Sequence, residues 1–222
     1  MINGVINIYK ERGFTSHDVV AKLRGILKQK KIGHTGTLDP DAEGVLPVCL
    51  GKGTRLCDML TDHSKVYEAV LLLGQSTDTQ DVSGNVLQEA PVDVSEEEVR
   101  EAIMSFVGPY DQIPPMYSAL KVNGKKLYEL ARAGKEVERQ ARHVDLPAIE
   151  ILEIKFPVVK FRVECSKGTY IRSLCADIGE KLCCGGTMQS LVRTRVGEFR
   201  LVDALTLAQL QELRDKERLE EA

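Results

Sequence analysis

A glycine-punctuated loop in the first quarter of the chain presents one aspartate on a rigid mount. The loop runs from Gly33 to Gly44, and Asp39 stands in it directly before Pro40. A following proline disfavours the helical conformation at Asp39, and the glycines let the backbone approach a bulky ligand. The carboxylate that such a loop holds out can serve as a nucleophile or as a general base. An ordinary Asx-Pro turn is the alternative when the loop is taken alone.

Arg172 is a second charged residue that could belong to a functional site, and it stands where a predicted strand is followed by a helix. Gly168 makes a turn after the strand, and Tyr170 and Arg172 open the helix. A guanidinium beside a carboxylate keeps that carboxylate ionised and fixes its orientation, so Arg172 could pair with Asp39. The alternative is a surface arginine on a helix. Tyr67 is a further aromatic candidate, although periodicity allows it equally to be a half-buried strand residue.

Positive charge is concentrated in two runs, although the formal net charge is −3. The first run occupies residues 22–31, directly before the Asp39 loop, and the second occupies residues 121–142. Acidic residues gather elsewhere, at residues 93–101 and 212–221. A local basic patch can bind nucleic acid whatever the net charge, whereas a solvated helix face explains each run equally well when it is taken alone.

The segment that begins at Ile113-Pro114-Pro115 mixes aromatic residues with cations. It continues through Tyr117, Lys121 and Tyr128 to Gly134. Tyrosines can stack on bases while lysines and arginines bind phosphates, and this combination suits a folded or single-stranded RNA. We therefore expect residues 113–142 to form an inserted clamp.

Metal and nucleotide cofactors are not expected. The six cysteines show no CxxC spacing, the four histidines form neither HExxH nor the zinc deaminase pattern, and Gly51–Thr54 lacks the GxxxxGK spacing of a nucleotide loop. With 43% hydrophobic residues the chain can bury a core, but it has no apolar run long enough to cross a bilayer. Val5–Ile8 is too short for a signal peptide. We expect a cytoplasmic protein.

The elements that must position these residues interleave without a regular βαβ rhythm. Strands are predicted at residues 5–9, 46–50, 66–74, 149–154 and 158–165, and helices at residues 19–27, 54–60, 99–107 and 171–182. Ser16 is the expected cap of the first helix, and Ser95 with Glu98 forms a capping box before the third. Phe161 and Val163 alternate with charged residues, which indicates antiparallel pairing. The pattern predicts an α+β fold with a mixed, mainly antiparallel central sheet flanked by helices.

Four ordered motifs together carry a family resemblance over about residues 3 to 210. They are GHTGTLDPDAEGVLPVCLGKGTR, KVYEAVLLLGQSTDTQDVSG, PPMYSALKVNGKKLYELARAG and CSKGTYIRSL. The combination closely resembles the TruB family of tRNA pseudouridine synthases. The resemblance implies the pseudouridine synthase fold, a cofactor-free reaction and a tRNA substrate, whose T-loop uridine at position 55 is detached from C1′ and rejoined through C5.

The resemblance also implies roles for individual residues. Asp39 would be the essential carboxylate, and Arg172 would hold it by a salt bridge. Tyr67 would stack against the flipped uracil and could serve in removing the C5 proton. The type of residue does not decide whether Asp39 attacks C1′, attacks C6 or removes the C2′ proton. The implied substrate-binding residues are His34, Arg55, Tyr170, Leu191, Lys121, Lys125, Lys126 and Arg132.

The expected organisation is one catalytic domain at residues 1–212, with the RNA-binding thumb inserted at residues 113–142. Residues 213–222 read as a charged tail, and we expect the small PUA-type domain that is common in the family to be absent. A monomer is expected. Two other functions stay open: a pseudouridine synthase for another RNA, and an RNA-binding or RNA-folding module whose chemistry is incidental.

Overall fold

The computed structural model describes residues 2–216, which form parts of two compact units. The first unit comprises residues 1–68 and 191–222, and the second comprises residues 69–190. The expected tail at 213–222 lies outside the described residues from residue 217 onward. None of the helices in residues 2–216 has the length and hydrophobicity of a membrane-spanning segment.

The first unit is built on a mixed sheet. Strand β3 (Glu43–Leu50) pairs antiparallel with β1 (Gly4–Lys10) and with β2 (Ile32–His34). Near its start, β3 also pairs parallel with β13 (Gly186–Val196), through Val192 and Arg193. Strands β2 and β13 therefore share the edge of β3 that lies opposite β1. The short strand β14 (Phe199–Arg200) folds back antiparallel on β13. Seven of the eight residues of β3 are buried, as expected for a strand with neighbours on both sides.

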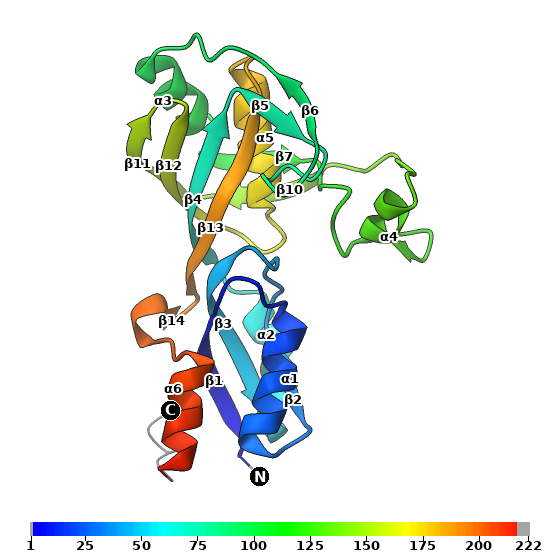
Figure 1. Cartoon of the computed structure of the whole chain (residues 1–222), viewed down its shortest axis with the longest axis vertical. Helices are drawn as coiled ribbons and strands as arrows, with labels where there is room; N and C mark the ends of the chain where they lie inside the picture. Colours follow the sequence, from blue (N-terminus) through cyan, green and yellow to red (C-terminus); the bar gives the residue numbers. More distant parts are fainter. Residues whose placement is uncertain (1, 217–222) are drawn as a thin grey trace. The chain divides into compact units, whose positions relative to one another are not determined.

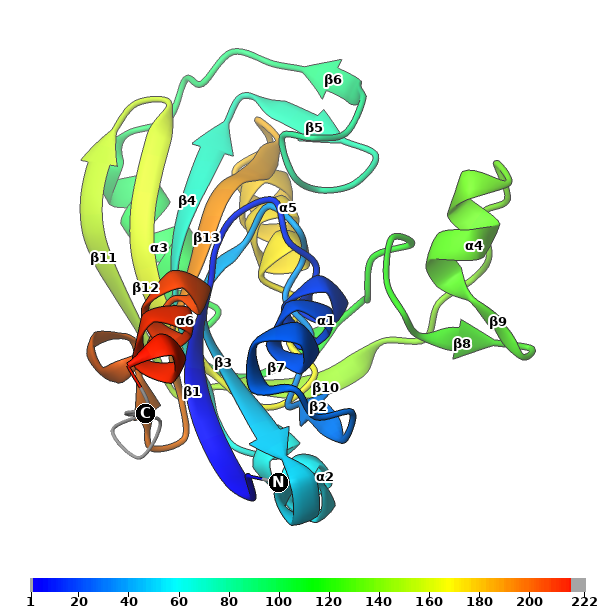
Figure 2. The ribbon, with the colours of Figure 1, turned by 60° about the horizontal axis from the view of Figure 1, so that its bottom comes forward.

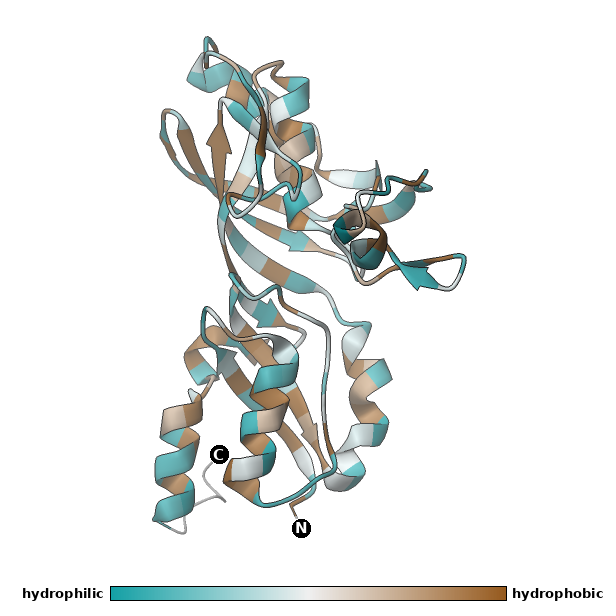
Figure 3. Cartoon of the chain, turned by 45° about the vertical axis from the view of Figure 1, so that its right-hand side comes forward, coloured by the Kyte–Doolittle hydropathy of each residue, from teal (hydrophilic) through white to brown (hydrophobic). Residues whose placement is uncertain are grey.

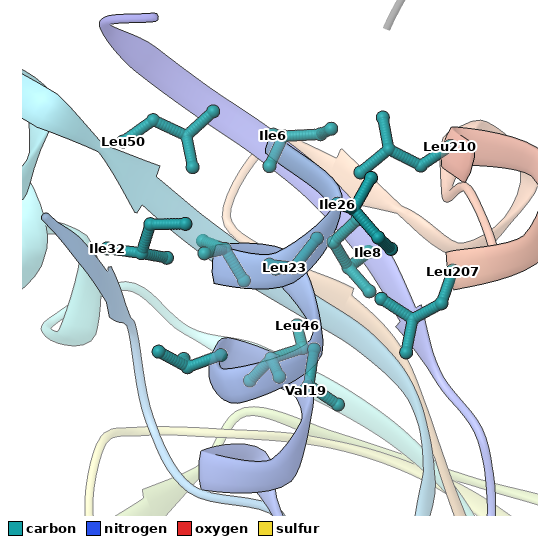
Figure 4. Close-up of a cluster of buried hydrophobic side chains, with 12 residues drawn as sticks. Ile6, Ile8, Val19, Leu23, Ile26, Ile32, Leu46, Leu50, Leu207 and Leu210 are labelled. Atoms are coloured by element: carbon teal, nitrogen blue, oxygen red, sulfur yellow. The ribbon is translucent and has the colours of Figure 1, made fainter. Parts of the chain in front are cut away.

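Two helices bury the first unit's core (Figure 1). The apolar side chains of α1 (Ser16–Leu27) and α6 (Leu207–Asp215) pack with those of β1, β2 and β3 into one cluster, shown in Figure 4. Val19, Leu23 and Ile26 recur at helical spacing on α1 and are buried there. The connection between β3 and β4 contains a 3₁₀ turn (Gly51–Leu56) and the short helix α2 (Cys57–Thr61).

The cap of α1 differs from the expectation. Thr15, not Ser16, is the N-cap: its hydroxyl accepts from the Asp18 backbone N–H, while the Asp18 carboxylate accepts from Thr15 N–H. Ser16 is the first helical residue and is fully buried. A threonine or a serine can fill this position, and Asp18 at the third helical position favours the earlier residue because it completes a reciprocal cap.

The main sheet continues from β13 in the order β13-β4-β12-β11, and its three remaining strands lie wholly or largely in the second unit. These strands are β4 (Lys65–Leu73), which begins in the first unit, β11 (Ala148–Lys155) and β12 (Val158–Cys165). Strands β11 and β12 pair antiparallel, and Phe161, Val163 and Cys165 are buried, as their alternation predicted. Helices α3 (Glu96–Met104) and α5 (Ile171–Lys181) belong to this unit, as does the hairpin of β5 (Gln75–Thr77) and β6 (Val86–Glu89).

The predicted clamp segment lies between β7 (Gly108–Gln112) and β10 (Arg142–Leu146), which pair antiparallel. It carries the two-residue strands β8 (Lys121–Val122) and β9 (Lys125–Lys126) and the helix α4 (Leu127–Arg132). Figures 1 and 2 both show the part with α4 standing away from β7 and β10. In Figure 3 the β8–β9 hairpin is largely coloured as hydrophilic.

The α+β class and the mixed sheet were predicted correctly, as were the five strands and the Ser95–Glu98 capping box. The helix predicted at residues 54–60 is instead a 3₁₀ turn that passes into α2. Strand β13, the longest strand among the described residues, was not predicted. Its sequence GTMQSLVRTRV mixes exposed and buried positions, so it shows no clean alternation.

Candidate functional site

The segment of the loop that precedes Asp39 is held by buried hydrogen bonds of the first unit. After β2, the Thr35 N–H and hydroxyl both donate to the Pro47 carbonyl, at 3.0 and 3.2 Å. Further on, the Leu38 N–H donates to the Ser16 hydroxyl at 3.0 Å. Thr35, Leu38 and Ser16 are all buried. Asp39 itself is half-buried, so the loop has a fixed path while the carboxylate keeps some access to solvent.

Lys10 holds the far side of the loop. Its ammonium, on a fully buried side chain, donates to the carbonyls of Ala42 at 2.6 Å, Pro40 at 3.3 Å and Glu11 at 3.1 Å. Burial lowers the Lys10 pKa, and the charges of Glu43 and Asp39 act in the opposite direction. Three carbonyl acceptors match the three donors of an ammonium group.

Arg193 binds the backbone at the start of the loop and just after its end. Its guanidinium donates to the carbonyls of Val45 at 2.8 Å, Gly36 at 3.2 Å and Thr37 at 3.5 Å, and only 1% of the residue is exposed. A buried charge is costly unless hydrogen bonds replace its hydration. The backbone of the Asp39 loop supplies those acceptors here, so Arg193 and the loop stabilise each other.

Gly44 closes the loop at a position that admits no side chain. Its φ is +111°, and a Cβ built on it would lie 2.2 Å from the carbonyl oxygen of Arg193. This close approach is the parallel pairing of β3 with β13. The glycine is therefore required because strand β13 lies against it, in addition to its unusual backbone conformation.

His34 stands at the end of β2, five residues before Asp39, and its ring meets that of His17 edge to face with centroids 5.2 Å apart. In the described part of the chain its buried Nδ1 has no hydrogen-bond partner. Burial lowers the His34 pKa, and the nearby charges of His17 and Arg193 lower it further. The ring is thus kept neutral at neutral pH.

Three more predicted site residues belong to the first unit. Tyr67 lies in β4 with 7% exposure, and Leu191 lies in β13, also 7% exposed. These two strands are joined beside Tyr67, where the Thr194 hydroxyl donates to the Val66 carbonyl at 3.2 Å. Arg55 is exposed in the 3₁₀ turn after β3.

In the second unit, Arg172 lies in the first turn of α5 and is 6% exposed. Its guanidinium donates to the carbonyls of Thr79 at 3.0 Å and Tyr117 at 2.9 Å, and its Nε lies 3.8 Å from Asp81. Arg172 therefore joins the β5–β6 loop to the beginning of the clamp segment. Its predicted pairing with Asp39 stays a prediction.

Asp81 was not named among the predicted site residues. Besides the ion pair with Arg172, one of its carboxylate oxygens accepts from the Thr79 hydroxyl, the Ser83 N–H and the Ser83 hydroxyl, at 2.5 to 3.0 Å. The signal in the sequence was the cluster of aspartate, serine and threonine at residues 76–83, which is typical of a turn held by its own side chains.

Tyr170, the residue before α5, is fixed by the side chain of Gln112. The Tyr170 N–H donates to Gln112 Oε1 at 2.7 Å, and Gln112 Nε2 donates back to the Tyr170 carbonyl at 3.0 Å. Gln112 is 1% exposed and is the last residue of β7. It was not predicted, because nothing in the sequence connects residue 112 with residue 170.

The residues of the clamp segment that are predicted to contact phosphates are all positively charged, and several of them lie close together. Lys121 and Lys126 are directly opposed in the β8–β9 pair, and Lys125 is exposed next to the turn. The Lys126 ammonium and the Arg132 guanidinium lie 5.3 and 5.4 Å from the centre of the Tyr128 ring. Opposed like charges repel in a two-stranded pair, so this hairpin is suited to an anionic partner.

Comparison with known proteins places these features in a family. The model of the TruB family pseudouridylate synthase N-terminal domain matches residues 24–171. The model of the tRNA pseudouridylate synthase B C-terminal domain matches residues 172–222. The first of these alone covers more than half of the chain.

Individual relatives agree with the family models. A tRNA pseudouridine synthase B of Lachnoclostridium phytofermentans is 60% identical over 99% of this chain and 74% of that protein. A tRNA pseudouridine synthase B of Alkaliphilus oremlandii is 54% identical over 97% of this chain and 72% of that protein.

Two solved structures share the fold. A chain of a Cbf5-Nop10-Gar1 complex is 35% identical, with a TM-score of 0.79 over 98% of this chain. A chain of an H/ACA RNP bound to a substrate RNA containing 2′-deoxyuridine is 32% identical, with a TM-score of 0.75 over 99% of this chain. The present chain spans 58% of each of those chains.

Proposed function

Because the chain belongs to the TruB family of pseudouridylate synthases, we propose that it isomerises the T-loop uridine at position 55 of tRNA to pseudouridine. In this reaction the N1–C1′ bond breaks and a C5–C1′ bond forms, while C5 loses a proton and N1 gains one. The proposed enzyme acts in the cytoplasm, as a monomer and without a cofactor.

The observation that carries the proposal is the held carboxylate of Asp39. Its loop is bound by Lys10 on one side and Arg193 on the other, through hydrogen bonds to six carbonyls in all, five of them between Gly36 and Val45. A group that must meet one atom of a substrate gains from such prior fixation, because little motion has to be frozen in the reaction. Asp39 is proposed as the essential carboxylate, acting at C1′, at C6 or on the C2′ proton.

Tyr67 and Arg172 complete the proposed catalytic set. Tyr67 is proposed to stack on the extruded uracil and Arg172 to pair with Asp39. Burial supports the second role: Arg172 is 6% exposed, and a guanidinium in that setting is orientated by fixed partners instead of by water. Its contacts with Thr79, Tyr117 and Asp81 give it such partners.

The proposed RNA contacts fall into two groups. His34, Arg55, Tyr170 and Leu191 are proposed to surround the extruded nucleotide, and His34 to occupy the space that the base vacates. Extruding the uridine costs a few kcal/mol of lost base stacking. The neutral ring of His34 can offset part of this cost when it fills the space that the base leaves. Lys121, Lys125, Lys126 and Arg132 are proposed to bind phosphates of the T-arm through the thumb, residues 113–142.

A second candidate function is pseudouridine formation in a different RNA. It is favoured by the similarity to chains of H/ACA complexes, one of which holds a substrate RNA. Tritium release from C5-tritiated uridine separates the two functions. Faster release from a T-arm stem-loop than from unrelated stem-loops of equal length supports the tRNA substrate, and equal or slower release contradicts it.

A further inference from the structure

We infer that Gln112 is a positioning residue for the proposed reaction. It fixes the place of Tyr170, a proposed nucleotide contact, and joins this residue to the base of the thumb. The inference rests on the proposed function for its catalytic consequence. Its structural part rests on the second unit alone.

The side-chain amide of Gln112 makes the two backbone hydrogen bonds of Tyr170 that a neighbouring strand would otherwise make. Its Oε1 accepts from Tyr170 N–H at 2.7 Å, and its Nε2 donates to the Tyr170 carbonyl at 3.0 Å. Both backbone groups of one residue are thus satisfied by one side chain. Since Tyr170 is the N-cap residue of α5, and its own side chain makes no cap hydrogen bond, the Gln112 amide also fixes where that helix begins.

The orientation of the Gln112 amide is itself fixed by a buried chain of hydrogen bonds. Tyr110 donates its hydroxyl to the Asp177 carboxylate in a short contact, and its oxygen is then free to accept from Gln112 Nε2 at 3.4 Å. A flipped amide would place Oε1 against two acceptors, the Tyr110 oxygen and the Tyr170 carbonyl. Only one orientation therefore satisfies Gln112.

Burial strengthens these hydrogen bonds. Gln112 is 1% exposed, and burial raises the pKa of both Asp177 and Tyr110. A buried amide that loses its partners has no water to replace them, so the alternatives to the observed arrangement are costly. Gln112 is therefore a rigid support for Tyr170.

Gln112 also marks the base of the thumb. It is the last residue of β7 and is directly opposed to Arg142, the first residue of β10, so the chain leaves the sheet and returns to it at this pair. From there Tyr117 reaches back, and its carbonyl accepts from Arg172 in the first turn of α5. The thumb root and the start of α5 are thus joined by Gln112 on one side and Arg172 on the other.

The test compares Gln112→Met with Gln88→Met, a matched change of an exposed glutamine on β6. Methionine has a similar length and makes neither hydrogen bond. Hydrogen exchange of the segment around Tyr170, measured by mass spectrometry without RNA, is expected to be at least tenfold faster in Gln112→Met and unchanged in Gln88→Met. Unchanged exchange in Gln112→Met overturns the structural part.

The catalytic part is tested on a T-arm stem-loop by tritium release and filter binding. Gln112→Met is expected to lower kcat at least tenfold and to leave the Kd for the stem-loop within about threefold. Combined with Tyr170→Ala, it is expected to add no further loss, because both changes remove one positioned ring. Unchanged kcat, or losses that multiply, overturns the positioning role.

Failure of the proposed function gives a different result. If the unaltered chain binds the stem-loop but releases no tritium from any RNA, the proposed function is wrong. The exchange experiment still decides whether Gln112 holds Tyr170, because it involves neither RNA nor turnover.

Discussion

Arg193 donates a hydrogen bond from Nη2 to the carbonyl oxygen of Gly36, 3.2 Å away, and thereby joins strand β13 to the loop that carries Asp39. The two residues are 157 positions apart in the sequence. The Asp39 loop is therefore held by a strand that lies far from it in the sequence. The position of the proposed catalytic carboxylate and the folding of the first unit therefore depend on the same contact.

Arg193→Met is expected to destabilise the chain by about 3 kcal/mol or more, because three buried carbonyls lose their donor. Arg200→Met, a change of an exposed arginine that pairs with Asp203, is expected to cost less than about 1 kcal/mol. Urea denaturation followed by circular dichroism measures both. Similar midpoints for the two variants would refute a structural role for the buried guanidinium.

Gly44→Ala is expected to destabilise the chain by more than about 4 kcal/mol, since its Cβ would lie 2.2 Å from the Arg193 carbonyl oxygen. Gly25→Ala is the matched control: it lies inside α1, where a Cβ meets nothing within 4 Å. Alanine should stabilise that helix by about 0.5 to 1 kcal/mol. Thermal melting compares the two, and a Gly44→Ala variant as stable as the parent would be inconsistent with the pairing of β3 and β13.

His34 gives the chain a pH-dependent stability. Its folded-state pKa is lowered from 6.5, so between the two pKa values the unfolded chain binds more protons than the folded chain. The contribution of neutral His34 to the free energy of unfolding is therefore fully present above pH 6.5. It is lost as the pH falls from that value toward the pKa of His34 in the folded chain. The parent should lose more stability between pH 7.5 and pH 5 than His34→Gln does.

Urea denaturation at the two pH values measures this difference. His143→Gln is a control at an exposed histidine. An equal loss of stability in the parent and in His34→Gln would show that His34 is not the group that resists protonation.

In RNA binding, His34→Ala is expected to weaken uridine extrusion more than the chemical step. Stopped-flow fluorescence of a labelled stem-loop measures extrusion, and tritium release measures the chemical step.

The basic hairpin of the thumb should determine the salt dependence of RNA binding. Replacing Lys121, Lys125 and Lys126 by glutamine removes up to three phosphate contacts. The slope of log K against log salt concentration should then fall in magnitude by about 2 to 3. Replacing Lys155, Lys181 and Lys216 by glutamine removes three exposed lysines outside both basic runs, and this control of equal charge change should leave the slope unchanged. Unchanged slopes in the thumb variant would exclude its lysines as phosphate contacts.

Much of the fold was predictable because local patterns determine it. The alternation in residues 158–165 and the apolar spacing of α1 follow from side-chain burial on one face, which a single sequence shows directly. The Ser95–Glu98 box is equally local. These predictions needed no knowledge of which segments meet in space.

The parts that could not be predicted depend on partners distant in the sequence. No local pattern marks Arg193 as a buried residue, yet it is buried because the Asp39 loop supplies its acceptors. Lys10 is buried for a similar reason. Gln112 supports Tyr170 across 58 positions, and no local signal marks it. For the same reason β13 was not predicted, since its neighbours β3 and β4 determine its burial.

The measurement that tests the central claim most directly is tritium release from a T-arm stem-loop carrying C5-tritiated uridine. The chain and its Asp39→Asn variant are compared at equal salt and RNA concentrations, after circular dichroism and filter binding show that both fold and bind. The account predicts release by the chain and none above background by the variant. Equal release by both would contradict the role of Asp39, and no release by the chain would contradict the proposed activity.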